Sequence, residues 1–123
     1  MSVKQSWLIN FPYERPPLTS NQRMHWGQKM TLTRKVRRVA AKESAHIPAL
    51  GKCRVQLVWL VLDNRRRDVD NVVPTLKAMC DGLVDAGLVP DDTPEYMEKL
   101  MPVIHKVDRE FGPAKLQLII EEM

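Results

Sequence analysis

Two pairs of aspartates, Asp68 with Asp70 and Asp91 with Asp92, stand in one central stretch, RRRDVDNVVPTLKAMCDGLVDAGLVPDD, which runs from 65 to 92. Asp68 and Asp70 are two residues apart, so on an extended chain both side chains point the same way. Neighbouring carboxylates repel each other, and a hard cation such as Mg²⁺, which takes oxygen ligands, would offset that repulsion. At a phosphodiester, such an ion polarises phosphoryl oxygens and lowers the pKa of a bound water. Together with Asp91 and Asp92, the pair therefore predicts a candidate metal site.

The same aspartates also have a purely structural interpretation. Asp68 would be a turn residue, and Asp70 would be an acid in the first turn of a helix, where the helix dipole favours it. Asp91 and Asp92 would be solvated turn residues. Spacing alone does not decide between the two interpretations.

Lys77 is the candidate catalytic cation of this stretch. It follows Asp70 by seven residues, about 700° of α-helix, so the two side chains are predicted to share one side of a helix. A lysine there would stabilise the charge that develops on a phosphate during hydrolysis. The alternative is an ordinary helix ion pair with Asp81, four residues further on.

The elements that must position these residues follow from periodicity and turn residues. Asn71 is a candidate N-cap for the helix after the motif, and Gly87 is placed to end it. The expected elements are strand 4–10, helix 28–46, strand 53–62, helix 71–86, strand 97–108 and strand 114–122. The order β-α-β-α-β-β predicts a mixed α+β fold, with a small mixed sheet and two main helices.

Length and composition set the class of protein. The 123 residues fit a single domain, 1–123, and 44% hydrophobic with 28% charged residues is typical of a globular chain. No apolar run approaches the roughly 20 residues of a membrane span, so no membrane partner is expected. Cys53 and Cys80 stand in apolar contexts and are interpreted as buried thiols of a cytoplasmic protein.

Charge is divided unevenly along the chain. Residues 1–60 hold 11 Lys and Arg against two acids, whereas residues 61–123 hold 8 against 13. Such a basic half suits a polyanion, and Trp26 within it either covers the core or stacks on an unpaired base. The candidate DNA-binding side chains are arginines of the early loop, of the first helix and of the tract before the motif: Arg23, Arg34, Arg37, Arg38, Arg65, Arg66 and Arg67.

The combination RRRDVDN…LKAMCDGLVDAGLVPDD resembles the signature of the RusA-like Holliday-junction resolvases, small crossover-junction endodeoxyribonucleases mostly of phage and prophage origin. PPLTSNQRMHW resembles the N-terminal loop of that family, and LQLIIEEM resembles its C-terminal end. The resemblance implies a Mg²⁺-dependent nuclease, for which Mn²⁺ is expected to substitute. It would resolve four-way junctions by paired symmetric nicks in DNA recombination and repair, in a bacterial or phage-infected cell.

The resemblance also implies roles for individual residues. The metal-binding aspartates fall on Asp68, Asp70 and Asp92, with Asp91 as a further candidate ligand. The catalytic lysine falls on Lys77 when the alignment is anchored on K-A-x-x-D and A-G. In the founding pattern this lysine stands four residues after D-x-D, a position that Pro74 occupies here.

The resemblance further implies a homodimer, since a four-way junction has approximate two-fold symmetry. The C-terminal half carries more apolar residues than one small sheet face needs, and the surplus would supply an interface. These residues are Met97, Leu100, Met101, Val103, Ile104, Ile119 and Ile120. Two other functions stay open: a nuclease for other branched DNA, and a DNA-binding protein without catalytic activity.

Overall fold

A mixed five-stranded sheet with two α-helices forms the structure, a computed structural model that describes residues 4–123. This confirms the predicted α+β class. In chain order the elements are β1 (Ser6–Phe11), α1 (Trp26–Glu43), β2 (Cys53–Val61), the 3₁₀ turn η1 (Val69–Val72), α2 (Val73–Asp85), β3 (Met97–Lys99), β4 (Val103–Lys106), the 3₁₀ turn η2 (Arg109–Phe111) and β5 (Lys115–Glu122). In the part of the chain so described, no helix is long and apolar enough to cross a membrane.

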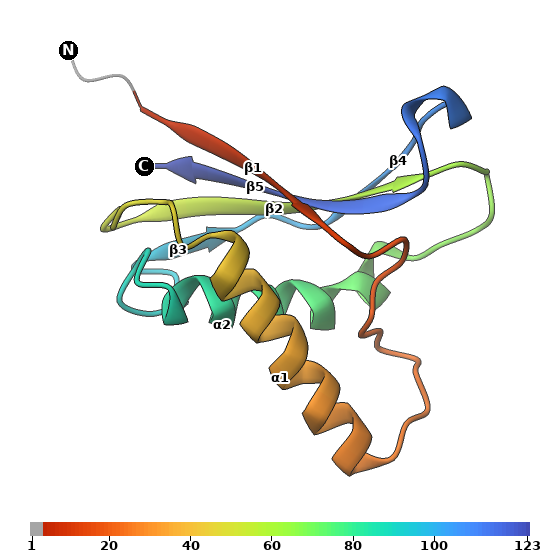
Figure 1. Cartoon of the computed structure of the whole chain (residues 1–123), viewed down its shortest axis with the longest axis horizontal. Coiled ribbons are helices and arrows are strands. Elements are labelled where there is room, and N and C mark those ends of the chain that lie inside the picture. Colours follow the sequence, from red (N-terminus) through yellow and green to blue (C-terminus); the bar gives the residue numbers. More distant parts are fainter. Residues whose placement is uncertain (1–3) are drawn as a thin grey trace.

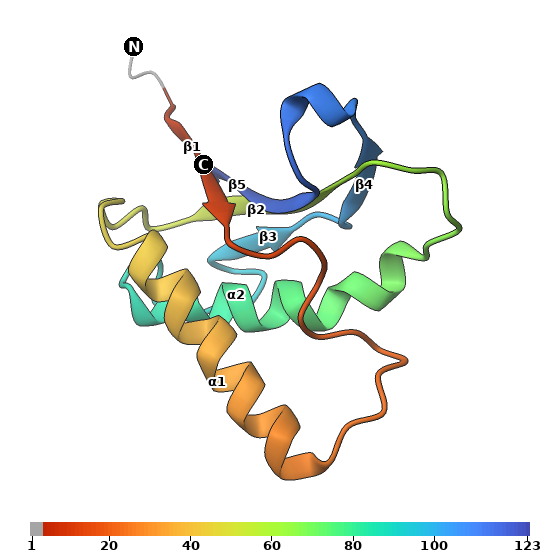
Figure 2. The same cartoon turned by 45° about the vertical axis from the view of Figure 1, so that its right-hand side comes forward.

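The strands lie in the order β1-β5-β2-β3, and β4 also pairs with β2. β5 is antiparallel to both β1 and β2, whereas β3 and β4 run parallel to β2. Both helices cover the same face of this sheet, and α2 runs beneath it from the far end of β2 back toward β3 (Figures 1 and 2). No α-helix of residues 4–123 covers the opposite face.

The strand predicted at 97–108 is interrupted. β3 pairs with the start of β2 and β4 with its end, so both belong to one edge that breaks at 100–102. Pro102 is buried in this break and has no N–H to give to a ladder. The Leu100 N–H still donates to the Val55 carbonyl at 2.9 Å, which holds the interrupted edge against β2.

The core fills the space between the sheet and the helices. Met79 and Leu83 on α2 are fully buried, as are Val55 and Leu57 on β2 and Leu118 on β5. The helices approach closely at Gly82 of α2, where an added Cβ would lie 2.4 Å from the Arg37 carbonyl oxygen of α1. Only glycine therefore permits this spacing of the two helices.

The sequence predicts the C-terminal end of α2 correctly but not its N-terminal end. Gly87 has φ 86°, and the N–H of Leu88 donates to the carbonyl of Leu83 at 3.2 Å, so the predicted C-terminal stop is confirmed. The predicted N-cap at Asn71 is wrong. The chain first makes η1, in which the Asn71 backbone N–H donates to the Asp68 carbonyl, and α2 begins at Val73 without a side-chain cap.

Candidate functional site

The D-x-D motif lies at the entry to η1, after the connection 62–67 that leaves the C-terminal end of β2. Asp68 and Asp70 are both exposed, and neither carboxylate makes a hydrogen bond or ion pair with another residue of 4–123. Their backbone carbonyls are engaged instead, since Asp68 accepts from the Asn71 N–H at 3.1 Å and Asp70 from Ser20 Oγ at 3.2 Å. The backbone of the motif is thus fixed while both carboxylates stay available to a cation.

The loop 12–25 between β1 and α1 contains Pro12, Pro16 and Pro17 and is called here the proline-rich loop. Hydrogen bonds fasten it to the D-x-D motif. Thr75, fully buried in the first turn of α2, donates its hydroxyl to the Leu18 carbonyl at 2.6 Å and accepts the Leu18 N–H at 3.1 Å. The Ser20 N–H donates to the Asn71 carbonyl at 3.3 Å. The proline-rich loop and the D-x-D motif therefore lie side by side, although the sequence alone does not predict this contact.

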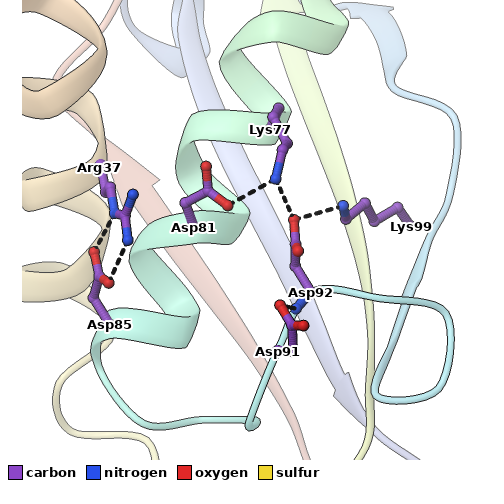
Figure 3. Close-up of polar contacts among 7 residues, drawn as sticks. All are labelled: Arg37, Lys77, Asp81, Asp85, Asp91, Asp92 and Lys99. Carbon is purple, nitrogen blue, oxygen red and sulfur yellow. Dashed lines mark hydrogen bonds and ion pairs between the residues drawn. The ribbon is translucent and has the colours of Figure 1, made fainter.

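A second group of charged residues surrounds Asp92, on the loop between α2 and β3 (Figure 3). Lys77 Nζ lies 2.6 Å and Lys99 Nζ 2.9 Å from the same oxygen, Asp92 Oδ2. Lys77 Nζ also lies 2.9 Å from Asp81 Oδ1, so the helix ion pair considered for Lys77 is present. Lys99 is absent from the sequence-based site, and no motif or spacing around it signals this contact.

The predicted alignment of Lys77 with Asp70 assumed one continuous α-helix from 71 to 86. Asp70 lies in η1, whose 3₁₀ geometry turns by about 120° per residue, so the angle for one continuous α-helix does not apply and the shared side stays a prediction. The amine of Lys77 contacts Asp81 and Asp92. The ligand role of Asp92 and the catalytic role of Lys77 stay predictions.

The two aspartates of the D-D pair have different surroundings. Asp91 is exposed, and its Oδ1 accepts the backbone N–H of Asp92 at 2.8 Å, which is a local turn contact. Asp92 has a side chain only 15% exposed and directed toward the lysines. Both lysines contact Oδ2, so the other oxygen of Asp92 keeps its acceptor capacity.

Charge pairing stabilises the ionised forms of Asp92 and Lys77. The hydrogen bond from Lys77, followed by that from Lys99, holds the pKa of Asp92 well below its usual range. Conversely, the hydrogen bonds to Asp92 and Asp81 raise the pKa of Lys77. Near neutral pH the site therefore contains an ionised Asp92 and a protonated Lys77.

The aspartates can be tested as a magnesium site by their donor chemistry. Mg²⁺ in phosphate-processing sites is usually held by one or two carboxylates together with water and substrate phosphate oxygens. The free carboxylates of Asp68 and Asp70 fit that requirement. Within residues 4–123, however, no three Asp, Glu, His or Cys side chains form a group that could hold a metal ion. Asp68, Asp70 and Asp92 are thus not assembled as one three-carboxylate cluster.

The three arginines before the motif play different parts. Arg67 is the most enclosed, with its guanidinium 5.1 Å from the Trp59 ring centroid and its Nη2 2.7 Å from Asp63 Oδ1. Its side chain is 17% exposed, against 82% for Arg65, whose Nε lies 3.6 Å from Asp63 Oδ2. Arg66 is exposed and forms no ion pair among the described residues. Arg67 therefore shapes the connection before Asp68, while Arg65 and Arg66 face solvent.

Two adjoining cavities lie beside this connection, with volumes of about 390 and 220 Å³. Arg66, Arg67 and Trp59 line both of them, and so does Arg15 from the proline-rich loop. Asp68 lines the smaller one. Together these cavities form a groove, called here the arginine groove, that ends at the first aspartate of the motif.

The basic face of α1 contributes less uniformly than its sequence indicates. Arg37 spans to α2, where its Nη2 lies 2.8 Å from Asp85 Oδ1 and its Nε contacts Oδ2 (Figure 3). Arg34 and Arg38 are exposed and unpaired within residues 4–123, as is Arg23 in the loop. Trp26 is 74% exposed at the start of α1, so it does not cover the core.

No family model matches the chain, and no curated protein matches it in sequence.

Proposed function

We propose that this protein is a Mg²⁺-dependent endodeoxyribonuclease that resolves four-way DNA junctions. The observation that carries the proposal is the pair of free carboxylates, Asp68 and Asp70, of which Asp68 lines the end of the arginine groove. Negatively charged side chains exposed beside a cationic groove suit a metal ion that is shared with a bound phosphate. A cytoplasmic location goes with this function, and the free thiols of Cys53 and Cys80 agree with it.

Each residue of the site has a distinct role in this proposal. Asp68 and Asp70 would hold Mg²⁺ or Mn²⁺. Asp92, through its unpaired oxygen, or Asp91 would become the third ligand when their loop moves toward the D-x-D motif, since these carboxylates are not grouped with Asp68 and Asp70 within residues 4–123. When bound, the ion would polarise the phosphodiester and lower the pKa of a water molecule. Lys77 donates hydrogen bonds, and a phosphate oxygen that gains charge during hydrolysis would be a further acceptor for it.

The arginines supply binding rather than chemistry. Arg65 and Arg66 offer guanidinium groups to phosphates on either side of the cleavage position, since neither is enclosed by the protein. Arg23, Arg34 and Arg38 extend the cationic surface along the loop and α1. Because such contacts reach the backbone of DNA, they position the duplex without reading its sequence.

A homodimer is part of the proposal. The sheet face that lacks helices exposes apolar side chains, including Leu8 at 53% and Val103 at 39%. In the strand register Leu8 lies beside Ile119, and Val103 beside Val58, so these residues share that face. Met97 and Ile120, also expected at an interface, are instead buried in the core. Sedimentation equilibrium of wild type and Leu8→Glu tests the dimer, and a wild-type monomer would contradict it.

The nuclease proposal is tested by incubating a synthetic four-way junction and a linear duplex with and without Mg²⁺. Asp70→Asn is expected to reduce junction cleavage at least about 100-fold, since losing a metal ligand costs several kcal/mol. Binding should persist or tighten, because one negative charge near the phosphates is removed. Asp108→Asn, an exposed aspartate at the start of η2, is the matched control.

Three results would redirect the proposal. If wild-type protein binds the junction but never nicks it, the protein is a non-catalytic DNA-binding protein. If it nicks flaps or forks in preference to four-way junctions, the metal site stands and the substrate changes. If Asp70→Asn cleaves as well as Asp108→Asn, the D-x-D motif is not the metal site.

A further inference from the structure

The smaller cavity of the arginine groove differs in composition from a surface that binds only phosphates. Pro16 and Val72, both buried, contribute apolar walls, and Trp59 adds an aromatic one. Asn21 and Asn71, residues with amide side chains, line it from two different segments. Phosphates need cations and N–H donors, whereas apolar walls and neutral amides suit a base.

The two amides have hydrogen-bonding capacity to spare. Asn21 Oδ1 accepts the Thr19 hydroxyl at 3.1 Å, which leaves its NH₂ group without a partner among residues 4–123. The side chain of Asn71 makes no hydrogen bond within that range. An amide can both donate and accept, so it complements the mixed donors and acceptors on the Watson–Crick edge of a base.

The walls of this cavity are held in place before any ligand binds. Thr75 fixes Leu18 through two hydrogen bonds, and Ser20 is tied to Asp70 and Asn71. On the other side, the Trp59 indole N–H donates to the Glu14 carbonyl at 3.0 Å. A preformed pocket avoids the cost of ordering loops during binding.

From this geometry we infer that the smaller cavity is a subsite for one unstacked nucleotide of DNA, with its base among Trp59, Asn21 and Asn71. Arg15 and Arg66 line the same cavity and would hold the phosphates of that nucleotide. Asp68 also lines it, which places the unstacked nucleotide next to the candidate metal ligands. The inference rests on the proposed function in that DNA is the ligand.

Size and substrate agree with a single base. The cavity of about 220 Å³ is smaller than pockets for drug-sized ligands, which hold roughly 300–1,000 Å³, and this size suits one base better than a stacked pair. Unstacking costs least where bases are already poorly stacked or paired, as at the exchange point of a junction. The subsite would therefore favour branched DNA over continuous duplex, which a cationic surface alone does not do.

The probe for this subsite is a four-way junction with 2-aminopurine at the exchange point, whose fluorescence rises when the base leaves its stack. Titration is done in EDTA, so the readout does not depend on cleavage. Wild-type protein is expected to raise the emission several-fold at saturation. The double variant Asn21→Ala/Asn71→Ala should lose at most about tenfold in junction affinity. At saturation it should lose most of the rise in 2-aminopurine emission.

Arg38→Ala is the control, because it should weaken binding while leaving the emission at saturation unchanged. Circular dichroism melting of each variant confirms that it is folded. An absent rise with wild-type protein at saturation overturns the subsite, and so does a full rise with the folded double variant. Nicking without a rise in emission overturns the subsite alone, whereas a rise without nicking supports it and refutes the nuclease.

Discussion

Lys77 Nζ lies 2.6 Å from Asp92 Oδ2, and this contact joins residues that are 15 positions apart in the chain. It fastens the second half of the candidate site, on the loop before β3, to the helix that begins just after the D-x-D motif. Lys99 contacts the same oxygen, so Asp92 would stay paired if the amine of Lys77 turned toward a phosphate. The two lysines are therefore expected to act differently in catalysis.

Lys77→Met is predicted to lower the cleavage rate at least about tenfold, with little change in junction affinity, because it removes a cation that acts on the developing charge. Lys99→Met, the matched control, should lower it less, since Lys77 still pairs with Asp92. Single-turnover rates at saturating Mg²⁺ measure both. Equal rates for Lys77→Met and wild type would make Lys77 a structural partner of Asp81 and Asp92 only.

Arg37 and Arg38 are neighbours with different predicted effects. Arg38→Ala should weaken junction and duplex binding alike and reduce the slope of log affinity against log salt by about 1, the signature of one phosphate contact. Arg37→Ala should leave that slope unchanged, because its guanidinium is committed to Asp85. Arg37→Ala should lower the free energy of unfolding by less than about 1 kcal/mol, because the ion pair with Asp85 is exposed.

Affinities over a salt series and thermal melts of both variants decide the point. If Arg37→Ala changes the slope of log affinity against log salt more than Arg38→Ala does, DNA displaces Asp85 from Arg37. In that case the ion pair would be a resting contact of the DNA-free protein.

Local patterns predicted much of the fold. The alternation of Leu116, Leu118 and Ile120 placed the last strand, and Gly87 ended α2 where a left-handed residue was needed. Local rules failed where a competing backbone contact was available. Asn71 looked like an N-cap, but its backbone joins the turn at Asp68 and the loop at Ser20 instead.

The candidate site was less predictable, because its contacts span the fold. Nothing near Lys99 shows that a loop will bring Asp92 to it. Likewise the tract Arg65–Arg67 reads as three equal cations, yet Trp59 and Asp63 enclose only one of them. The different exposure of these arginines depends on which end of β2 the tract follows, and the pairing of the strands in the sheet determines what lies beside that end.

The two cysteines should be unreactive in the native protein. Burial raises the pKa of Cys53 to about 11 and that of Cys80 to about 12, so both are neutral thiols near pH 8. Iodoacetamide at that pH is expected to modify the native chain far more slowly than the chain unfolded in guanidinium. Equal rates would show that the thiols are reached without unfolding.

The same thiols predict how stability depends on pH. Their folded pKa values lie above the ordinary value of 9.0, so their contribution is complete below pH 9 and is lost as pH rises toward 11 to 12. The free energy of unfolding from urea titrations should fall across that window. In Cys80→Ala the free energy of unfolding should fall less steeply with pH. If its dependence on pH is the same as in wild type, other titrating groups cause the fall.

Thr75 links the stability of the fold to the candidate site. Its hydroxyl is fully buried and satisfies both the N–H and the carbonyl of Leu18, which fixes the proline-rich loop against the D-x-D turn. Thr75→Val keeps the shape but leaves two buried backbone groups unpaired, at roughly 1–3 kcal/mol each. We expect a loss of about 2–6 kcal/mol in unfolding free energy and weaker junction cleavage.

Thr75→Ser retains the hydroxyl and is the matched control, with a smaller loss of stability from the missing methyl group. Urea unfolding and cleavage below each variant's own melting temperature separate the two effects. If Thr75→Val is as stable as Thr75→Ser, the Leu18 contact does not hold the loop. If it is less stable but cleaves normally while folded, the loop supports the fold without shaping the site.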